Sequence, residues 1–291
     1  MSHSPVQAIF ATLVICLASL SYSQAQTQAS CTFNIFQAPG LVNGVNDFRT
    51  TVGQSRSNPA RGFIRYSGGG VSYFTAPNAT STNFTGRNDA GVSVGFYNTQ
   101  GTSIPKGGFI LQGSKYTPFT HPKAVLGTVL SGINKFNSSV GFYFDSAQHE
   151  HGFKRYSNGG LTSLNYPGAL DTAPLAINDS GTVVGTFVGS GSDGSSHGFL
   201  YHGGSWAQID DTRGDPGNTE LVGISNANVI VGFFQLLDNY ISFLYTNGVF
   251  KNIEVPNADA TQVTDISAKG IISGNAQYDD GSIKEFTATC K

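Results

Sequence analysis

Apolar and polar positions alternate in a unit that is clearest in the middle of the chain. A short apolar stretch, Leu175–Ile177, is followed by a polar turn, Asn178–Gly181, and by a β-branched stretch, Thr182–Phe187. After a Gly/Ser loop, residues 197–201 and 206–210 form two more alternating stretches with a Gly–Gly turn between them. β-Branched and aromatic stretches bounded by turn residues are typical of strands. The pattern predicts four antiparallel strands.

The same unit recurs six times, and each copy carries a glycine in its second predicted strand and a phenylalanine in its third. The glycines recur every 42 to 47 residues, at Gly53, Gly95, Gly141, Gly185, Gly232 and Gly274. The phenylalanines are Phe63, Phe109, Phe153, Phe199, Phe243 and Phe286. A glycine inside a strand indicates close backbone approach, which we expect between neighbouring units. We expect the phenylalanines to form the buried core between units.

Six units of about 44 residues, each with four antiparallel strands, match the blades of a β-propeller. A parallel β-helix would show shorter coils without hairpins, and a two-sheet sandwich would not need six copies of one unit. The sequence therefore predicts an all-β fold, a six-bladed β-propeller.

The two ends of the chain predict how the ring closes. The sixth unit stops at Cys290, after its third strand, whereas Thr32–Phe36 resembles a fourth strand without a blade. Pairing the two completes blade six and removes exposed strand edges. Antiparallel pairing places Cys31 beside Cys290, and we expect a disulfide there; a metal site built from these two thiolates is the less favoured alternative.

The N-terminus predicts export. The apolar run Ala8–Leu20 is too short to cross a bilayer comfortably, and Ser23–Ala25 is a small-residue cleavage site. We expect a signal peptide over residues 1–25, a single propeller domain over 26–291, and a secreted or periplasmic protein. An uncleaved anchor helix and a lipoprotein attached through Cys31 are the alternatives. No other stretch of the chain could span a membrane.

Charge gives no sign of a charged partner. The net charge is −2, only 12% of residues are charged, and the 16 Lys and Arg residues are spread along the chain. A nucleic-acid surface is therefore not expected. Neither a cofactor nor an oligomer is indicated, and we expect a monomer.

One motif resembles a known family. Ile-Asn-Asp-x-Gly-x-Val-Val-Gly at 177–185, followed by His-Gly-Phe-Leu-Tyr at 197–201, resembles the bacterial extracellular repeats named for His-Ala-Phe, the HAF type. Here Ala is replaced by Gly, and the His occurs only as His151 and His197; the other units carry Arg61, Gly107, Ile241 and Glu285 or its neighbours. The resemblance implies an exported repeat protein and supplies no catalytic residues.

The lengths of the predicted loops indicate which face of the propeller would bind a ligand. The turns between first and second strands and between third and fourth strands are short, and we call their side the short-turn face. The longer second-to-third loops and the connections between units emerge together on the loop-rich face. Because binding residues concentrate on loops held by a rigid scaffold, we expect ligand contacts on this face. The candidates are Tyr97, Tyr143, His149, Glu150, Asp211, Tyr240 and Tyr278.

Metal and catalytic motifs are weak. His149 and His151 could point the same way on a strand, as metal ligands do, but the position of His151 in the repeat explains it without a metal. Residues 193–195 and 279–281 could each give one carboxylate to calcium, although plain turns explain them better. No catalytic or metal-binding residue is assigned. The carboxylates available to a hydrolase are Glu150, Asp211, Asp215 and Asp238.

These observations favour a non-catalytic exported propeller that recognises an extracellular glycan or protein on its loop-rich face. The alternative is a secreted polysaccharide hydrolase or lyase with its site on the same face. A matrix role without a discrete site is the third hypothesis.

Overall fold

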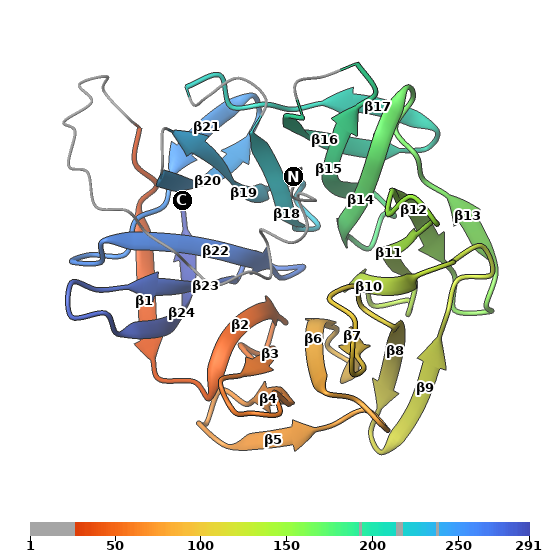
Figure 1. The fold of residues 1–291 in the computed structure, drawn as a ribbon. Coiled ribbons are helices and arrows are strands. Elements are labelled where there is room, and N and C mark those ends of the chain that lie inside the picture. Colours follow the sequence, from red (N-terminus) through yellow and green to blue (C-terminus); the bar gives the residue numbers. More distant parts are fainter. Residues whose placement is uncertain (1–26, 192–193, 214–217, 237–238) are drawn as a thin grey trace.

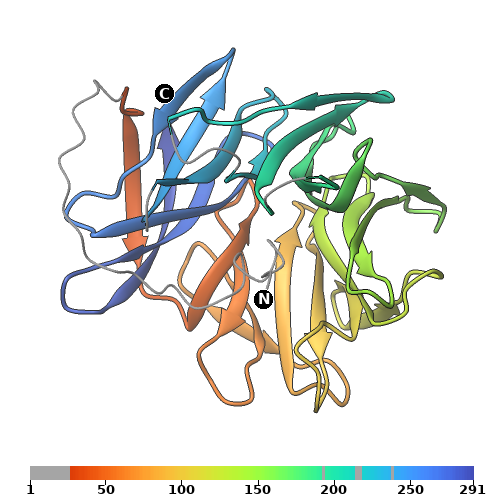
Figure 2. The same ribbon diagram turned by 45° about the horizontal axis from the view of Figure 1, so that its top comes forward.

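The structure, a computed structural model, describes residues 27–191, 194–213, 218–236 and 239–291. Six four-stranded antiparallel sheets surround a central axis (Figure 1), which confirms the all-β, six-bladed propeller. In the turned view the strands of each blade follow one another outward from the axis (Figure 2). The expected signal peptide, and the residues Asp193, Asp215 and Asp238, lie outside the described residues.

In blades 1 to 5 the strands follow chain order from the axis to the rim. Blade 1 comprises β2 (Gly40–Val45), β3 (Thr51–Ser55), β4 (Gly62–Arg65) and β5 (Val71–Phe74). Blade 2 comprises β6 (Ser81–Arg87), β7 (Val92–Asn98), β8 (Gly107–Gln112) and β9 (Lys115–Phe119). Blade 3 comprises β10 (Gly127–Ile133), β11 (Ser139–Phe144), β12 (Glu150–Arg155) and β13 (Leu161–Ser163).

The second half of the ring repeats this order until the last blade. Blade 4 comprises β14 (Ala169–Ile177), β15 (Val183–Gly189), β16 (Ser196–His202) and β17 (Ser205–Gln208). Blade 5 comprises β18 (Thr219–Ile224), β19 (Ile230–Leu236), β20 (Asn239–Thr246) and β21 (Val249–Asn252). Blade 6 comprises β22 (Ala260–Ile266), β23 (Ile272–Gln277), β24 (Ile283–Cys290) and, as its outermost strand, β1 (Cys31–Phe36).

The recurring glycine faces a β-bulge in the innermost strand of its own blade. Gly53 pairs with Val42, and the register shifts between Val42 and Gly44; all six blades repeat this arrangement. A Cβ on Gly53 would lie 1.9 Å from the carbonyl oxygen of Leu41, and the other five distances are 2.0 to 2.3 Å. The expected contact between neighbouring units was therefore wrong: the close approach is inside the blade, where no side chain fits.

The recurring phenylalanines form the core between blades, as expected. All six are fully buried. Phe153 of blade 3 shares a cluster with Val94 of blade 2, and Phe199 of blade 4 shares one with Val140 of blade 3. In blades 1 to 5 a valine precedes the recurring glycine and packs in the same cluster as the phenylalanine of the next blade; in blade 6 this residue is Ser273. This pairing explains why both residues recur with the period of the repeat.

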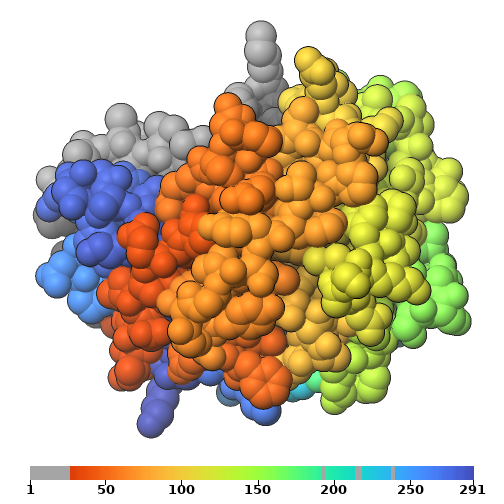
Figure 3. All heavy atoms as spheres, turned by 90° about the horizontal axis from the view of Figure 1, so that it is seen from below, coloured from red at the N-terminus to blue at the C-terminus, as the bar shows by residue number. Residues whose placement is uncertain are grey.

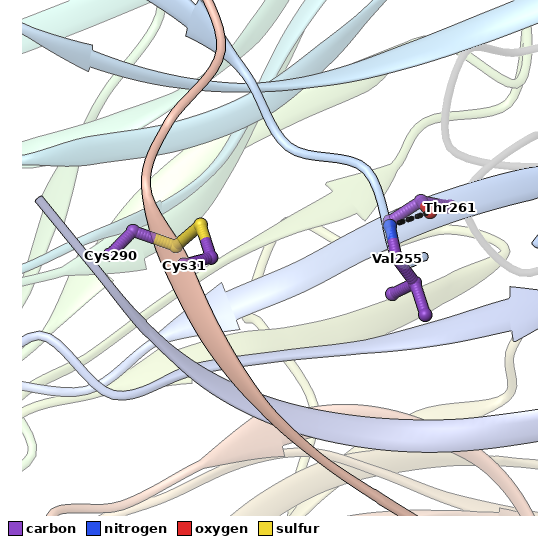
Figure 4. The surroundings of a disulfide bond; sticks show 4 residues. All are labelled: Cys31, Val255, Thr261 and Cys290. Atoms are coloured by element: carbon purple, nitrogen blue, oxygen red, sulfur yellow. Dashed lines mark hydrogen bonds between the residues drawn. A yellow bond between two sulfur atoms is a disulfide. The ribbon is translucent and has the colours of Figure 1, made fainter. Parts of the chain in front are cut away.

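The N-terminal strand closes the ring. β1 pairs antiparallel with β24, with Cys31 opposite Cys290, and the two cysteines form a disulfide across a sequence separation of 259 residues (Figure 4). In the space-filling view, segments from the two ends of the chain lie side by side on the rim (Figure 3). The expected closure and disulfide are confirmed.

Glu285 reinforces the junction between blades 6 and 1. It is fully buried, although its position in the third strand is occupied by glycine in blades 1 to 4. Its carboxylate accepts the N–H of Ala38 at 2.6 Å and pairs with the Arg56 guanidinium at 2.7 Å. Burial raises the pKa of Glu285, whereas these two donors act in the opposite direction. The described part of the chain contains no helix long and apolar enough to span a bilayer.

Candidate functional site

A cavity of about 330 Å³ lies on the propeller axis. Its walls are the C-terminal halves of the six innermost strands and the turns that follow them, so it opens on the short-turn face. Part of its lining belongs to the largest apolar cluster of the core: Leu175, Val222, Phe233 and Val263. These side chains form an apolar floor beneath a polar mouth.

Four buried asparagines hold the mouth rigid. Asn134 is typical: its Oδ1 accepts the N–H groups of Phe136 and Ser138 within its own turn, both at 3.1 Å. Its Nδ2 donates to the carbonyl oxygen of Asn178 in the next blade, also at 3.1 Å. The same blade-to-blade bond is made by Asn46, Asn88 and Asn178. The side chains thus fix both the turn and its neighbour, which preorganises the rim of the cavity.

The next residue of each turn adds charge to this rim. Asp47 accepts the backbone N–H of Lys269 at 2.8 Å, and Asp89 accepts that of Asp47 at 3.0 Å. Asp179 accepts the backbone N–H of Lys135 at 3.1 Å and pairs with its ammonium at 3.3 Å. Burial, together with the neighbouring Asp47 carboxylate, raises the pKa of Asp89. The mouth therefore presents carboxylate oxygens in fixed positions.

Asp265 is the most unusual residue of the cavity wall. It follows the bulge of β22, at a position occupied in the other five blades by Gly44, Gly86, Gly132, Ala176 and Gly223. Its Oδ2 accepts the N–H of Val45 in blade 1 at 3.0 Å, and its Oδ1 accepts the N–H of Ile266 at 2.8 Å. Burial raises the pKa of Asp265 to about 7, against the effect of these two donors. A carboxyl group that titrates near neutrality thus lines the cavity.

Two exposed aromatic rings flank the cavity. Phe48 and Phe136 lie in the first turns of blades 1 and 3 and are 62% and 57% exposed. Each directly follows a lining residue, Asp47 and Lys135 respectively. Neither ring is part of the cavity lining, and singly exposed apolar side chains are common on protein surfaces. The two rings are candidates for ligand contact because they lie in the turns that form the mouth.

None of the seven residues selected from the sequence lines this cavity. The cluster of blade 3 is nevertheless brought together on the loop-rich face. His149 Nδ1 lies 3.2 Å from Asp171 Oδ1, and the same oxygen accepts the N–H of Glu150 at 2.8 Å. The Glu150 side chain is buried. Tyr143 stacks on His121 with ring centroids 4.2 Å apart, and burial raises its pKa.

The other four candidates do not converge. Asp211 is buried and bound by the Arg213 guanidinium through both carboxylate oxygens. Tyr278 lies beneath the Lys284 ammonium, 4.7 Å from its ring centroid. Tyr97 is partly buried in a core cluster, whereas Tyr240 is 45% exposed. Of these four side chains, Tyr240 is the one that presents an exposed ring to a ligand.

Sequence reasoning missed Glu220, the second residue of β18. Its side chain is buried, and its Oε2 has no hydrogen-bond partner. Burial, reinforced by the nearby charge of Glu150, raises the pKa of Glu220 to about 8. Burial and the charge of Glu220 in turn raise the pKa of Tyr240. The sequence does contain one indication of this residue, because Glu220 directly precedes the apolar stretch Leu221–Ile224, where a charged side chain is unexpected.

Among the described residues, no group of three His, Cys, Asp or Glu side chains could hold a metal ion. In the turn at 279–281, Asp280 Oδ1 accepts the N–H of Ser282 at 2.8 Å. The other calcium candidate, 193–195, begins at Asp193, which lies outside the described residues.

Comparison with known proteins establishes the fold alone. No protein-family model and no curated protein matches this chain. It is similar to a TolB-like protein of Agrobacterium tumefaciens, with 13% identity and a TM-score of 0.56 over 91% of this chain and 99% of the other. It is also similar to the Aleuria aurantia lectin in complex with Fucα1-6GlcNAc, with 12% identity and a TM-score of 0.53 over 87% and 93%. Virginiamycin B lyase of Staphylococcus aureus gives 9% identity and a TM-score of 0.51 over 89% and 99%. The chain shares its propeller architecture with proteins of quite different activity.

Proposed function

We propose that this protein is an exported, non-catalytic recognition module that binds an extracellular glycan in the axial cavity. The observation that carries the proposal is the cavity itself: a rigid polar mouth, two exposed phenylalanine rings beside it and an apolar floor. Concave sites with a few fixed polar groups and apolar or aromatic walls are the usual form of small-molecule sites.

A sugar ring fits this chemistry because it has two kinds of surface. Its hydroxyl groups donate hydrogen bonds to carboxylates, and such charge-assisted bonds are the stronger kind. Asp47, Asp89 and Asp179 present carboxylates at the mouth. The C–H faces of the sugar pack on aromatic rings, which Phe48 and Phe136 offer at the rim. Because the turns are tied to one another, little conformational entropy is lost on binding.

Two further observations support recognition outside the cytoplasm. The Cys31–Cys290 disulfide is consistent with an oxidising compartment, and the resemblance to HAF-type extracellular repeats agrees with export. The Aleuria aurantia lectin, which shares the fold, binds a fucosylated disaccharide.

The loop-rich face remains the competing location for this site. Tyr240 is its exposed aromatic candidate, and the group formed by His149, Glu150 and Asp171 supplies its polar atoms. The proposal favours the cavity because its polar groups and apolar side chains converge on one hollow.

A glycan-array screen followed by calorimetry tests the function and its location together. Phe136→Ala should weaken a saturable hit at least tenfold, while Tyr156→Ala, an exposed tyrosine on the outer turn of the same blade, should leave it unchanged. Tyr240→Ala should also have no effect. Loss of binding in Tyr240→Ala with retention in Phe136→Ala would move the site to the loop-rich face. No binding to any glycan, with calcium or with EDTA, would contradict glycan recognition and favour a protein ligand.

One observation favours the second candidate, a polysaccharide hydrolase or lyase. Glu220 is a buried carboxyl group whose pKa of about 8 keeps it protonated at neutral pH, and the charge of a second carboxyl group, that of Glu150, contributes to this shift. A neutral acid beside another carboxyl group is the pairing used in general acid catalysis. Turnover of any polysaccharide in a substrate panel, abolished by Glu220→Gln, would establish this candidate.

A further inference from the structure

We infer that the sugar bound in the axial cavity is a neutral terminal residue that carries a methyl group, a 6-deoxy or N-acetyl sugar, and that the methyl group enters first. The inference rests on the proposed function and concerns the same cavity. It follows from the contrast between floor and mouth, from the charges at the mouth and from the size of the cavity.

The floor is apolar because two blades depart from the repeat. In blades 1 to 3 the residue inside the bulge is polar and bonds to the next blade: Thr85 Oγ1 donates to the Leu130 carbonyl at 2.7 Å, and Ser131 Oγ to that of Pro174 at 2.6 Å. In blades 4 and 5 this position is Leu175 and Val222, which face the cavity without a polar group.

A ligand tip that meets this floor must be apolar. A hydroxymethyl group placed against Leu175, Val222 and Phe233 would lose its bonds to water, because none of these three side chains can donate or accept a hydrogen bond. A methyl group loses nothing and gains the burial of its own surface against Val222 and Phe233. The polar edge of the sugar then faces outward, where the aspartates of the mouth lie.

The charges at the mouth favour a neutral sugar. Lys135 pairs with Asp179 and Lys269 with Asp47, at 3.3 and 3.7 Å. Within the described residues Asp89, Asp265 and the Arg87 guanidinium form no ion pair. The four aspartates of the lining and its three cations, Arg87, Lys135 and Lys269, nearly balance, so the carboxylate of a uronic or sialic acid would lose its hydration without a net attraction in return.

The size of the cavity favours the end of a glycan. A volume of about 330 Å³ lies at the small end of the range for ligand pockets, roughly 300 to 1,000 Å³. The cavity is lined by the C-terminal halves of the innermost strands and not by their first residues, so it does not extend along the whole axis. A chain that entered at the mouth must stop at the floor, and a terminal residue is therefore the part that fits.

Matched sugar pairs test the inference on the purified, disulfide-closed protein by calorimetry. The pairs are methyl α-L-fucoside with methyl α-L-galactoside, methyl α-L-rhamnoside with methyl α-L-mannoside, and N-acetylglucosamine with N-glycolylglucosamine. In at least one pair the methyl-bearing sugar should bind about tenfold more tightly, as one methyl group in a fitted apolar pocket allows. Val222→Thr, which puts a hydroxyl on the floor, should reduce that preference to about threefold or less; Val249→Thr, at a half-exposed valine of β21, is the matched control.

The outcomes separate this inference from the proposed function. Tighter binding of a methyl-bearing sugar, lost in Val222→Thr, supports both. Binding that Phe136→Ala weakens, but with equal affinity within every pair, overturns the inference and leaves the proposed function standing. Binding by none of the six sugars overturns both. Because the pairs are compared on the unmodified protein, a folding defect in Val222→Thr does not prevent a decision.

Discussion

Replacement of Glu220 by glutamine should remove a loss of stability that the wild-type protein suffers as the pH rises. The pKa of Glu220 is raised from 4.5 to about 8 by burial and by Glu150. In the unfolded chain the same carboxyl group ionises near its ordinary pKa. Between these two values the folded state holds a proton that the unfolded state has lost, so the wild-type protein loses stability as the pH rises through this window.

The magnitude follows from the size of the shift. Each pKa unit corresponds to about 1.4 kcal/mol, so the loss reaches roughly 5 kcal/mol once the folded carboxyl group has ionised. Between pH 5 and pH 8.5 it amounts to about 4 kcal/mol. Glutamine has nearly the same shape and does not ionise, so the variant is free of this loss. The variant should therefore gain about 4 kcal/mol over the wild type between these two pH values.

Urea denaturation of both proteins at pH 5 and pH 8.5 measures this difference. Glu254→Gln, at an exposed glutamate in the connection after β21, is the matched control for removal of one carboxyl group. If the difference in unfolding free energy between Glu220→Gln and the wild type is the same at both pH values, Glu220 is not held protonated by burial and the reasoning is refuted.

Three further predictions concern the scaffold, and denaturation midpoints check each of them. Cys290→Ser removes a cross-link over 259 residues and should cost about 5 kcal/mol; an unchanged midpoint under non-reducing conditions would show that strand pairing alone closes the ring. Asn134→Ala removes one buried and two partly buried hydrogen bonds and should cost about 3 kcal/mol, and a loss below about 1 kcal/mol would contradict the role of the asparagines in joining the blades. Gly141→Ala places a Cβ 2.0 Å from a carbonyl oxygen and should cost about 3 kcal/mol or more, whereas Gly68→Ala meets nothing within 4 Å and should be nearly neutral; equal effects would refute the bulge explanation.

The architecture could be predicted from the sequence because it depends on local patterns that recur in every unit. Turn residues at fixed intervals predict the blades, one phenylalanine per unit predicts the core, and the segment Thr32–Phe36, a fourth strand without a blade, predicts the closure. The reason for the recurring glycine could not be predicted, since a bulge depends on the register between two strands. Gly53 and Val42 meet only when β2 and β3 have paired.

The polar groups of the axial cavity were harder to predict because loop length directs attention to the opposite face of the propeller. Asn46 and its counterparts look like ordinary turn residues in the sequence. Their bonds to the next blade, which rigidify the mouth of the cavity, appear only in the closed ring. Asp265 occupies a position that is glycine in four of the other blades and alanine in the fifth. This equivalence becomes apparent only when the repeats are aligned on their bulges, so the carboxylate was not recognised as unusual from the sequence.

Closure of the ring by β1 has a consequence for how the protein is made. β1 is synthesised before all the blades but finds its partner only after them, because it pairs with β24. Blades 1 to 5 can form in order during synthesis, but blade 6 must wait for β24. A product truncated before β24 would leave β1 without a partner and the outer edge of β23 open, and open strand edges promote aggregation. The pairing of β1 with β24 thus acts as a check on completeness, because only chains that reach β24 can cover these edges.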